Sequence, residues 1–181
     1  MLASHTIPVQ IKTPSGADSS VRSFVVGIKD LMPIGYDKVR AAEELYKAKV
    51  IRWRQLVENL RVRKSDPLIR WRLGDEIDRF FSSLERKYGI VVTNQLEALS
   101  YDLPLSHDAL GFIIRVPNLF TRAEVEEAGL SWSKFQELTG IKDVKAMRDC
   151  FVLLKSGKIR HDKQIRAFKS AANRVVSHSG Q

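Results

Sequence analysis

Positively charged side chains recur at a regular spacing within one segment of the sequence. Arg40, Lys47, Arg54 and Arg61 follow one another at intervals of seven residues. On an α-helix this interval places the four side chains along one side, with a drift of about 20° per step. The row would extend over about 31 Å, close to the roughly 34 Å of one turn of duplex DNA. These residues could therefore contact successive phosphates; the alternative is an ordinary solvated helix face.

The net charge of the chain is concentrated in two segments. The 181 residues contain 30 Lys and Arg against 21 Asp and Glu, which gives a formal charge of +9. Residues 37–72 carry +6 and residues 142–181 carry +7, whereas residues 73–141 carry −5 and residues 1–36 carry +1. Two basic blocks around an acidic middle favour a polyanionic partner, nucleic acid before a membrane surface. Lysine-rich solvated faces are the plainer alternative.

We predict that Lys and Arg side chains of both blocks bind phosphates. The first block supplies Arg40, Lys47, Arg54, Arg61, Arg63 and Lys64. The second block supplies Lys155, Lys158, Arg160, Lys163, Arg166 and Lys169. Such contacts provide affinity for duplex DNA without reading its sequence.

Two segments have the spacing of a helix-turn-helix unit, residues 94–116 and residues 121–138. The second fits better, because an apolar residue, a turn glycine and a further apolar residue stand at the intervals of the motif. Its second helix would present Lys134 and Gln136 to base edges in the major groove. A purely structural helical corner is the alternative for both segments.

Residues suited to catalysis or metal binding do not form a recognisable set. Asp75, Glu76 and Asp78 are expected to face solvent from an amphipathic helix, and Cys150 is expected in the core between apolar neighbours. The four histidines lack metal-ligand spacing, and no glycine-rich phosphate loop is present. The sequence thus predicts a protein that is not an enzyme and that needs neither a cofactor nor a metal ion.

The first 36 residues are expected to form a small β-hairpin or arm. Segments 5–13 and 21–29 are rich in Ile, Val and Phe, and a turn-forming run of Pro, Ser and Gly separates them. Pro8 restricts the first strand to a sheet edge. A two-stranded hairpin is marginal alone, so it must pack on the domain or pair with a second copy of the chain.

Residues 37–176 are expected to form one helical domain, followed by a flexible tail over residues 177–181. A long helix beginning near Asp37 would pair with a second helix over 67–88, which Asp66 caps and Gly89 ends. Shorter helices follow, with ends predicted at Pro117, Gly129, Gly140 and Ser156. The first helix has a heptad seam that favours a homodimer, although packing within the chain would also satisfy it: Val39, Ala42, Tyr46, Lys49, Trp53, Leu56 and Leu60.

The sequence indicates an intracellular location. A single cysteine excludes an intramolecular disulfide, and no apolar run approaches the roughly 18 residues of a membrane span. The N-terminal segment has no basic start followed by an apolar stretch, so no export signal is expected. We expect a cytoplasmic protein, associated with the nucleoid if it binds DNA, and no membrane partner.

Several runs resemble the N-terminal helical domain of YhcG-like proteins. The runs 71–77 (WRLGDEI), 87–89 (KYG) and 96–103 (LEALSYDL) are similar to that family's "YWxIGxxI … YG … LSxDL" pattern. The run 130–135 (LSWSKF), with the later 141–143 and Arg148, resembles its "LSWSH … V-x-D … R" segment. The resemblance extends over roughly residues 40–170 with the same order and spacing.

The resemblance implies a mainly α fold and a part in DNA binding or in positioning a nuclease. YhcG-like proteins usually join this helical domain to a C-terminal PD-(D/E)XK nuclease domain, which would begin where the present chain ends. Lys134 stands where the family favours His, and residues 160–162 replace an expected Trp-Ser pair. The N-terminal hairpin lies outside the match.

These patterns predict a mainly α protein with a helical hairpin, helix-turn-helix-like short helices and the small N-terminal β element. The predicted function is non-catalytic binding of nucleic acid, with double-stranded DNA as the first choice. The alternative is an interaction or adaptor subunit of a nuclease or defence complex, whose basic surface meets an acidic protein or an RNA held by a partner.

Overall fold

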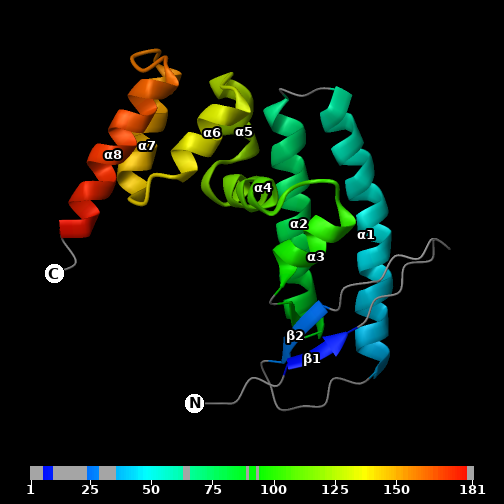
Figure 1. The fold of residues 1–181 in the computed structure, drawn as a ribbon. Helices are drawn as coiled ribbons and strands as arrows, with labels where there is room; N and C mark the ends of the chain where they lie inside the picture. The colour runs from blue at the N-terminus through cyan, green and yellow to red at the C-terminus, as the bar shows by residue number, and fades with distance from the viewer. Residues whose placement is uncertain are drawn as a thin grey trace. The chain divides into compact units, whose positions relative to one another are not determined.

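The computed structural model describes residues 6–9, 24–28, 36–62, 66–88, 90–92 and 94–178. These residues are mainly helical, as predicted (Figure 1). The helices of the described part are α1 (Tyr36–Val62), α2 (Pro67–Tyr88), α3 (Gln95–Asp102), α4 (His107–Leu119), α5 (Arg122–Ala128), α6 (Trp132–Thr139), α7 (Val144–Lys155) and α8 (Asp162–His178).

Two compact units make up the chain. The first contains Met1–Val62 and Asp75–Gly111, and the second contains Arg63–Gly74 and Phe112–Gln181. Helices α2 and α4 therefore contribute residues to both units. The predicted domain limits at residues 36 and 176 remain predictions.

Three short strands belong to the first unit. β1 (Thr6–Val9) pairs with β2 (Phe24–Ile28), and β2 pairs with β3 (Ile90–Val92), both in antiparallel register. β3 was not expected from the sequence, because a run of three residues carries no alternating pattern. The connection between β1 and β2 lies outside the described residues, so the hairpin remains a prediction.

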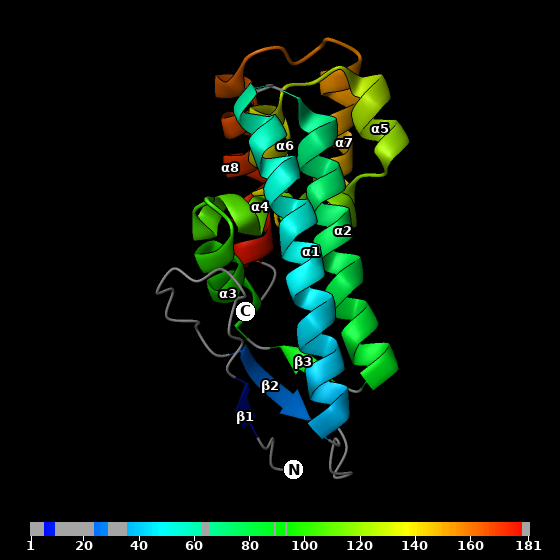
Figure 2. The ribbon, with the colours of Figure 1, turned by 90° about the vertical axis from the view of Figure 1, so that its right-hand side faces the viewer.

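The core of the first unit forms between α1 and α2, which run side by side in opposite directions (Figure 2). The ring of Trp53 is fully buried, and its centroid lies 5.5 Å from that of Phe80 in an edge-to-face arrangement. The buried positions of α1 are Ala42, Tyr46, Val50, Trp53, Val57 and Leu60. The predicted seam was therefore wrong at two positions.

Lys49 and Leu56 were expected in the seam but are only half-buried, and Val50 and Val57 take their places. A strict heptad repeat suits two helices that coil around each other over many turns. A straight helix keeps one face inward with a repeat of 3.6 residues, and this repeat selects the two valines and excludes the lysine.

Local capping residues define the helix ends of the second unit. The Asp66 carboxylate accepts hydrogen bonds from the backbone N–H groups of Leu68 (2.9 Å) and Ile69 (3.3 Å) at the start of α2. Thr121 and Glu124 form a reciprocal capping box at the start of α5, and Gly129 ends that helix with φ of 57°. Left-handed backbone of this kind favours glycine. These capping residues and the glycine were therefore sufficient to predict where the helices begin and end.

Arg148 of α7 fastens the end of α4 to the start of α5. Its guanidinium donates 2.6 Å hydrogen bonds to the Glu124 carboxylate and to the carbonyl oxygen of Leu119. The same guanidinium lies over the ring of Phe120, 5.2 Å from its centroid. Partial burial alone would raise the pKa of Glu124, but hydrogen bonds from Thr121 and the ion pair with Arg148 lower it below its usual value.

Helix α4 continues to Leu119, past the end that Pro117 predicted. Pro117 has no N–H group, so it cannot donate the helical hydrogen bond that the carbonyl oxygen of Ile113 would normally accept. The α-carbon of Gly74 in α2 approaches this carbonyl so closely that a methyl group at position 74 would overlap it. The same methyl group would lie 3.0 Å from Cγ of Pro117.

The other helix ends lie close to their predicted positions. Helix α6 ends at Gly140, whose φ of −83° is an ordinary right-handed value, and Asp143 caps α7 by accepting from Ala146 N–H. Helix α8 extends to His178, two residues beyond the end predicted at Val176.

We expect Gly74→Ala to lower the free energy of unfolding by about 3 kcal/mol or more, because the added methyl group meets the α4 backbone, which cannot move aside alone. Gly111→Ala is the matched control in α4, where the nearest atom to the new methyl group is Leu96 Cδ1 at 4.0 Å. The free energy of unfolding of Gly111→Ala should rise by about 0.5–1 kcal/mol, because alanine has a higher helix propensity than glycine. Denaturant unfolding measures this free energy for both variants. Equal changes in the two variants would contradict the close approach of Gly74 to the α4 backbone.

Acid should remove the contribution of Glu124 to stability. Because its pKa is depressed in the folded chain, this contribution is complete above the unfolded value of about 4.3 and declines as pH falls through the folded value. Arg148→Met should lower the free energy of unfolding by about 1.5–3 kcal/mol at neutral pH. It should also reduce the loss of stability on acidification, because Glu124 then has no ion-pair partner at position 148. Lys145→Met, an exposed change on the same helix, serves as the control in unfolding curves recorded between pH 3 and 7. An unchanged acid dependence in Arg148→Met would contradict this assignment.

Candidate nucleic-acid interface

Arg54 of the first predicted block is exposed, and its guanidinium forms part of a hydrogen-bonded network. Its Nε donates to the backbone oxygen of Asp102 at 2.8 Å, and its Nη2 lies 3.7 Å from Oδ1 of the same residue. The Tyr46 hydroxyl donates to Oδ2 of Asp102 at 2.6 Å. Burial, with the Asp102 charge, raises the pKa of Tyr46 far above its usual value. Arg54 thereby ties α1 to the end of α3.

The other described members of this row also pair with carboxylates. Lys47 lies 3.1 Å from Glu44, and Arg61 lies 3.2 Å from Glu58, each pair one helical turn apart. Arg40 belongs to α1, but its side chain lies outside the described part, as do Arg63 and Lys64. Each described cation of the row thus has an acidic neighbour, which reduces the charge available to a phosphate.

Arg54 and Arg61 line an open groove of about 430 Å³ in the first unit. The remaining lining residues are Glu58, Ser100, Tyr101, Asp102, Leu103 and Pro104. Two guanidinium groups and two carboxylates leave this groove without net charge. The C-terminal end of α3, which carries the negative end of the helix dipole, also borders the groove. An anion would therefore gain little electrostatic binding energy in this groove.

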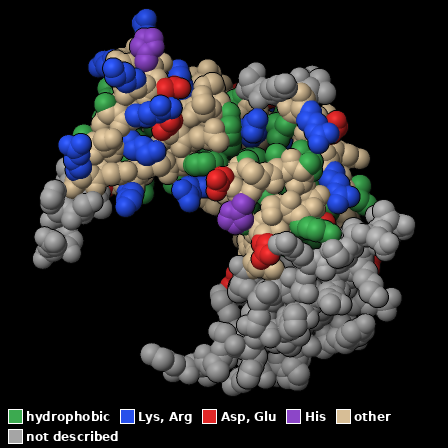
Figure 3. Space-filling view, viewed as in Figure 1, with side chains coloured by type: hydrophobic (Ala, Val, Ile, Leu, Met, Phe, Trp, Pro, Cys, Tyr) green, Lys and Arg blue, Asp and Glu red, His purple; other side chains and the backbone are tan. Residues whose placement is uncertain are grey.

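The second basic block has a different arrangement on α8. Lys163, Arg166 and Arg174 are exposed, and Lys169 is half-buried. With 3.6 residues per turn, Lys163 and Arg174 lie within about 20° of each other around the helix axis, and Arg166 lies about 60° away. Lys163, Arg166, Lys169 and Arg174 together are named the α8 cationic surface. Figure 3 shows Lys and Arg side chains gathered over this helix, with some acidic side chains among them.

Two members of the α8 cationic surface form no ion pair with a carboxylate of the described residues. Among the described residues, no carboxylate forms an ion pair with Lys163 or Arg174. In the sequence of α8 the only acidic residue is Asp162, at its first position. The two cations are about 16 Å apart along the helix axis. Their charges are thus available to a polyanion.

Glu137 of α6 contacts the other two members. Its Oε1 accepts a hydrogen bond from Arg166 Nε at 2.8 Å, and its Oε2 lies 3.5 Å from Lys169 Nζ. Partial burial would raise the pKa of Glu137, but the hydrogen bond from Arg166 and the two positive charges lower it below its usual value.

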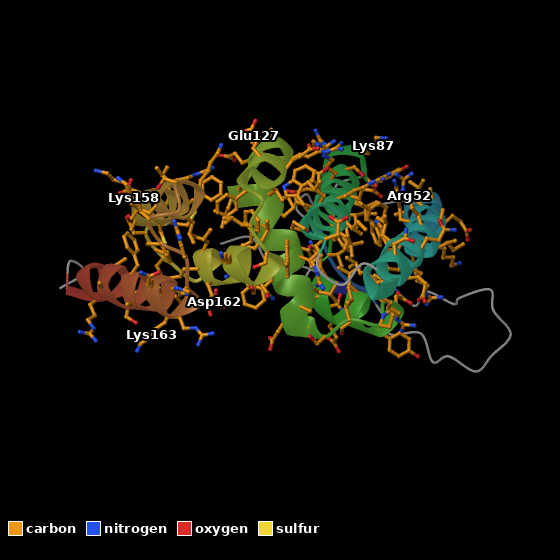
Figure 4. The ribbon with its side chains drawn as sticks, turned by 90° about the horizontal axis from the view of Figure 1, so that it is seen from above. Arg52, Lys87, Glu127, Lys158, Asp162 and Lys163 are labelled. Carbon is orange, nitrogen blue, oxygen red and sulfur yellow. The ribbon has the colours of Figure 1, made fainter. Side chains whose placement is uncertain are left out.

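The remaining cations of this block do not join the α8 cationic surface. Lys155 of α7 pairs with Glu127 of α5 at 3.0 Å. Lys158 is exposed, and Figure 4 shows Lys158 and Lys163 on opposite sides of the α7–α8 pair. Arg160 is exposed, and its Nε donates to the carbonyl oxygen of Gly157 at 3.0 Å. Consecutive basic residues in the sequence therefore divide between two surfaces of the second unit.

Two further cations were missed by sequence reasoning. Arg174 stands three helical turns from Lys163, so helical periodicity could have found it. Lys142 is exposed, and its backbone N–H donates to Oδ1 of Asn173 at 2.9 Å, which brings it beside the second half of α8. No sequence pattern relates residues 142 and 173.

Helix α6 offers little to a DNA groove. Lys134 and Gln136, the predicted base-reading residues, are both half-buried and project about 200° apart around the helix. Trp132, Phe135 and Leu138 are buried, so most of this short helix packs into the second unit. Gly129, Leu130 and Ser131 connect α5 to α6, and the helix-turn-helix assignment of this segment remains a prediction.

Two of the acidic residues of α2 that were expected to face solvent form ion pairs. Glu76 lies 2.9 Å from Arg52 Nε, and Asp75 lies 2.9 Å from Arg79 Nε. Asp75, Glu76 and Asp78 are all half-buried, so each faces solvent only in part. The neighbouring helix α1 brings Arg52 to Glu76, and sequence spacing cannot reveal such a partner.

The structure also bears on the predictions for the cysteine, metal binding and membrane insertion. Cys150 is buried, as predicted, and burial raises the pKa of its thiol. Within the described ranges there is no group of three His, Cys, Asp or Glu residues that could hold a metal ion. None of the described helices combines the length and the apolar character that a membrane span requires.

No protein-family model, curated protein or solved structure matches this chain.

Proposed function

We propose that this protein binds double-stranded DNA through the α8 cationic surface and catalyses no reaction. The observation that carries this proposal is the pair Lys163 and Arg174, exposed on one side of a helix with no ion pair to any described carboxylate. Release of counterions from DNA phosphates is the main source of affinity for such a surface.

The dimensions and side chains of α8 favour a duplex over a single strand. The roughly 16 Å from Lys163 to Arg174 corresponds to about five base pairs at 3.4 Å each. Proteins that bind single strands stack bases on exposed aromatic rings. Phe168 of α8 is half-buried and projects about 140° away from Lys163, so this surface supplies no such ring.

Binding of this kind requires neither a second copy of the chain nor a nuclease partner. The predicted homodimer, the nucleoid location and the YhcG-like relationship therefore remain predictions. The adaptor alternative uses the same cationic surface for an acidic protein, and it differs from our proposal in a measurable way. An adaptor would show no affinity for duplex DNA of its own, even at low salt.

Lys163→Gln should weaken binding to a short duplex several-fold and reduce the log–log salt slope by about 0.9, because one phosphate loses its cation. Lys158→Gln is a closely matched control. It removes the same charge from a position that is also exposed and belongs to the same unit, on the opposite side of the α7–α8 pair (Figure 4). Fluorescence anisotropy over a salt series measures both variants, and Arg174→Gln should resemble Lys163→Gln.

Two results would contradict this proposal. Absence of salt-dependent binding by the unaltered chain would exclude DNA binding and favour the adaptor function. Equal losses in Lys163→Gln and Lys158→Gln would place the interface elsewhere. Duplex RNA and single-stranded DNA of the same length, used as competitors, should displace the duplex DNA less effectively than unlabelled duplex DNA does.

A further inference from the structure

The Glu137 carboxylate lies between two cations of α8. One oxygen accepts a 2.8 Å hydrogen bond from Arg166 Nε, and the other lies 3.5 Å from Lys169 Nζ. Arg166 and Lys169 are three residues apart, so both side chains can reach one anion from adjacent turns of the helix. Carboxylate and phosphate oxygens accept the same charge-assisted hydrogen bonds from guanidinium and ammonium groups.

The position of Lys169 depends on the absence of a side chain at Gly140. The φ of −83° at Gly140 is available to any residue, so its conformation does not require glycine. A methyl group at this position would collide with the end of the Lys169 side chain. Gly140 therefore leaves the space in which the Lys169 ammonium group lies beside Glu137.

Other contacts hold α6 against α8 independently of Glu137. Asn173 Nδ2 donates to the Gly140 carbonyl oxygen at 3.1 Å, and Asn173 Oδ1 accepts from Lys142 N–H at 2.9 Å. Leu138 and Ile165 are fully buried in the same unit. The two helices can thus remain packed when the charge of Glu137 is removed.

We propose that Arg166 and Lys169 form a phosphate-binding subsite, and that Glu137 occupies its anion position in the free protein. This inference rests on the proposed function, because it names the part of the α8 cationic surface at which a backbone phosphate competes with a resident carboxylate. Lys163 and Arg174 attract the duplex without such competition. Glu137 accordingly limits the affinity, since a phosphate must displace it.

Glu137→Gln should tighten binding to duplex DNA several-fold and steepen the salt slope by about 0.9 for each additional phosphate that the surface neutralises. The amide retains the shape of the side chain and removes its charge. Glu127→Gln is the matched control, because it also frees one described cation, Lys155 at 3.0 Å, and raises the net charge by the same amount. Glu127 lies on the same side of the second unit as Lys158, away from Lys163 (Figure 4). Its substitution should change affinity much less.

Substitutions of the cations give a second readout in the otherwise unaltered chain. Arg166→Gln should weaken binding less than Lys163→Gln, because Glu137 already neutralises Arg166. In the Glu137→Gln background, Arg166→Gln should reduce the affinity for duplex DNA by the same factor as Lys163→Gln does. Thermal unfolding of every variant confirms that the chain is folded, and the comparison of Arg166→Gln with Lys163→Gln needs no change at Glu137.

The outcomes separate the subsite from the proposed function. If the unaltered chain shows no salt-dependent binding to DNA, the proposed function fails and the subsite fails with it. If the unaltered chain binds but Glu137→Gln binds no more tightly than Glu127→Gln, the subsite alone is overturned. Equal losses for Arg166→Gln and Lys163→Gln in the unaltered chain would overturn it as well.

Discussion

The close approach of Gly74 in α2 to the Ile113 carbonyl in α4 is the constraint on which the second unit depends. Pro117 leaves that carbonyl without its usual helical donor, and the absence of a side chain at Gly74 lets the two backbones meet. The end of α4 is thereby placed where Arg148 of α7 can donate to the Leu119 carbonyl oxygen. Helix α7 in turn packs beside α8, the helix that carries the cationic surface.

Charge pairing distinguishes the two basic blocks of this protein. In α1, each described cation of the predicted row lies near a carboxylate, and Arg54 holds the end of α3 through Asp102. Exposed pairs of this kind contribute little to stability, but they lower the positive potential at the surface. On α8, Lys163 and Arg174 have no ion-pair partner within the described part. Two blocks of similar net charge, +6 and +7, thus give surfaces that differ in the number of unpaired cations.

Much of the helical architecture was predictable, because helix ends depend on residues near them in the chain. Asp66, the Thr121–Glu124 capping box and Asp143 each satisfy backbone N–H groups within three residues. The α1 core was predictable only in part, because Val50 and Lys49 are neighbours and a heptad pattern selects the wrong one. Partners such as Arg52 and Glu76 could not be predicted, since they meet only when α1 packs on α2.

The sequence by itself determined a mainly helical chain, the positions of most helix ends and the presence of two basic blocks. These properties depend on composition, periodicity and short-range hydrogen bonds. Only the tertiary structure decided which cations share a surface and which already have a carboxylate partner. Lys158 and Lys163 are five residues apart and lie on opposite sides of α7 and α8 (Figure 4). Lys142, in contrast, donates its backbone N–H to Asn173, 31 residues further along the chain. The physical reason is that electrostatic interactions act over distances in space, and the packing of buried side chains sets those distances.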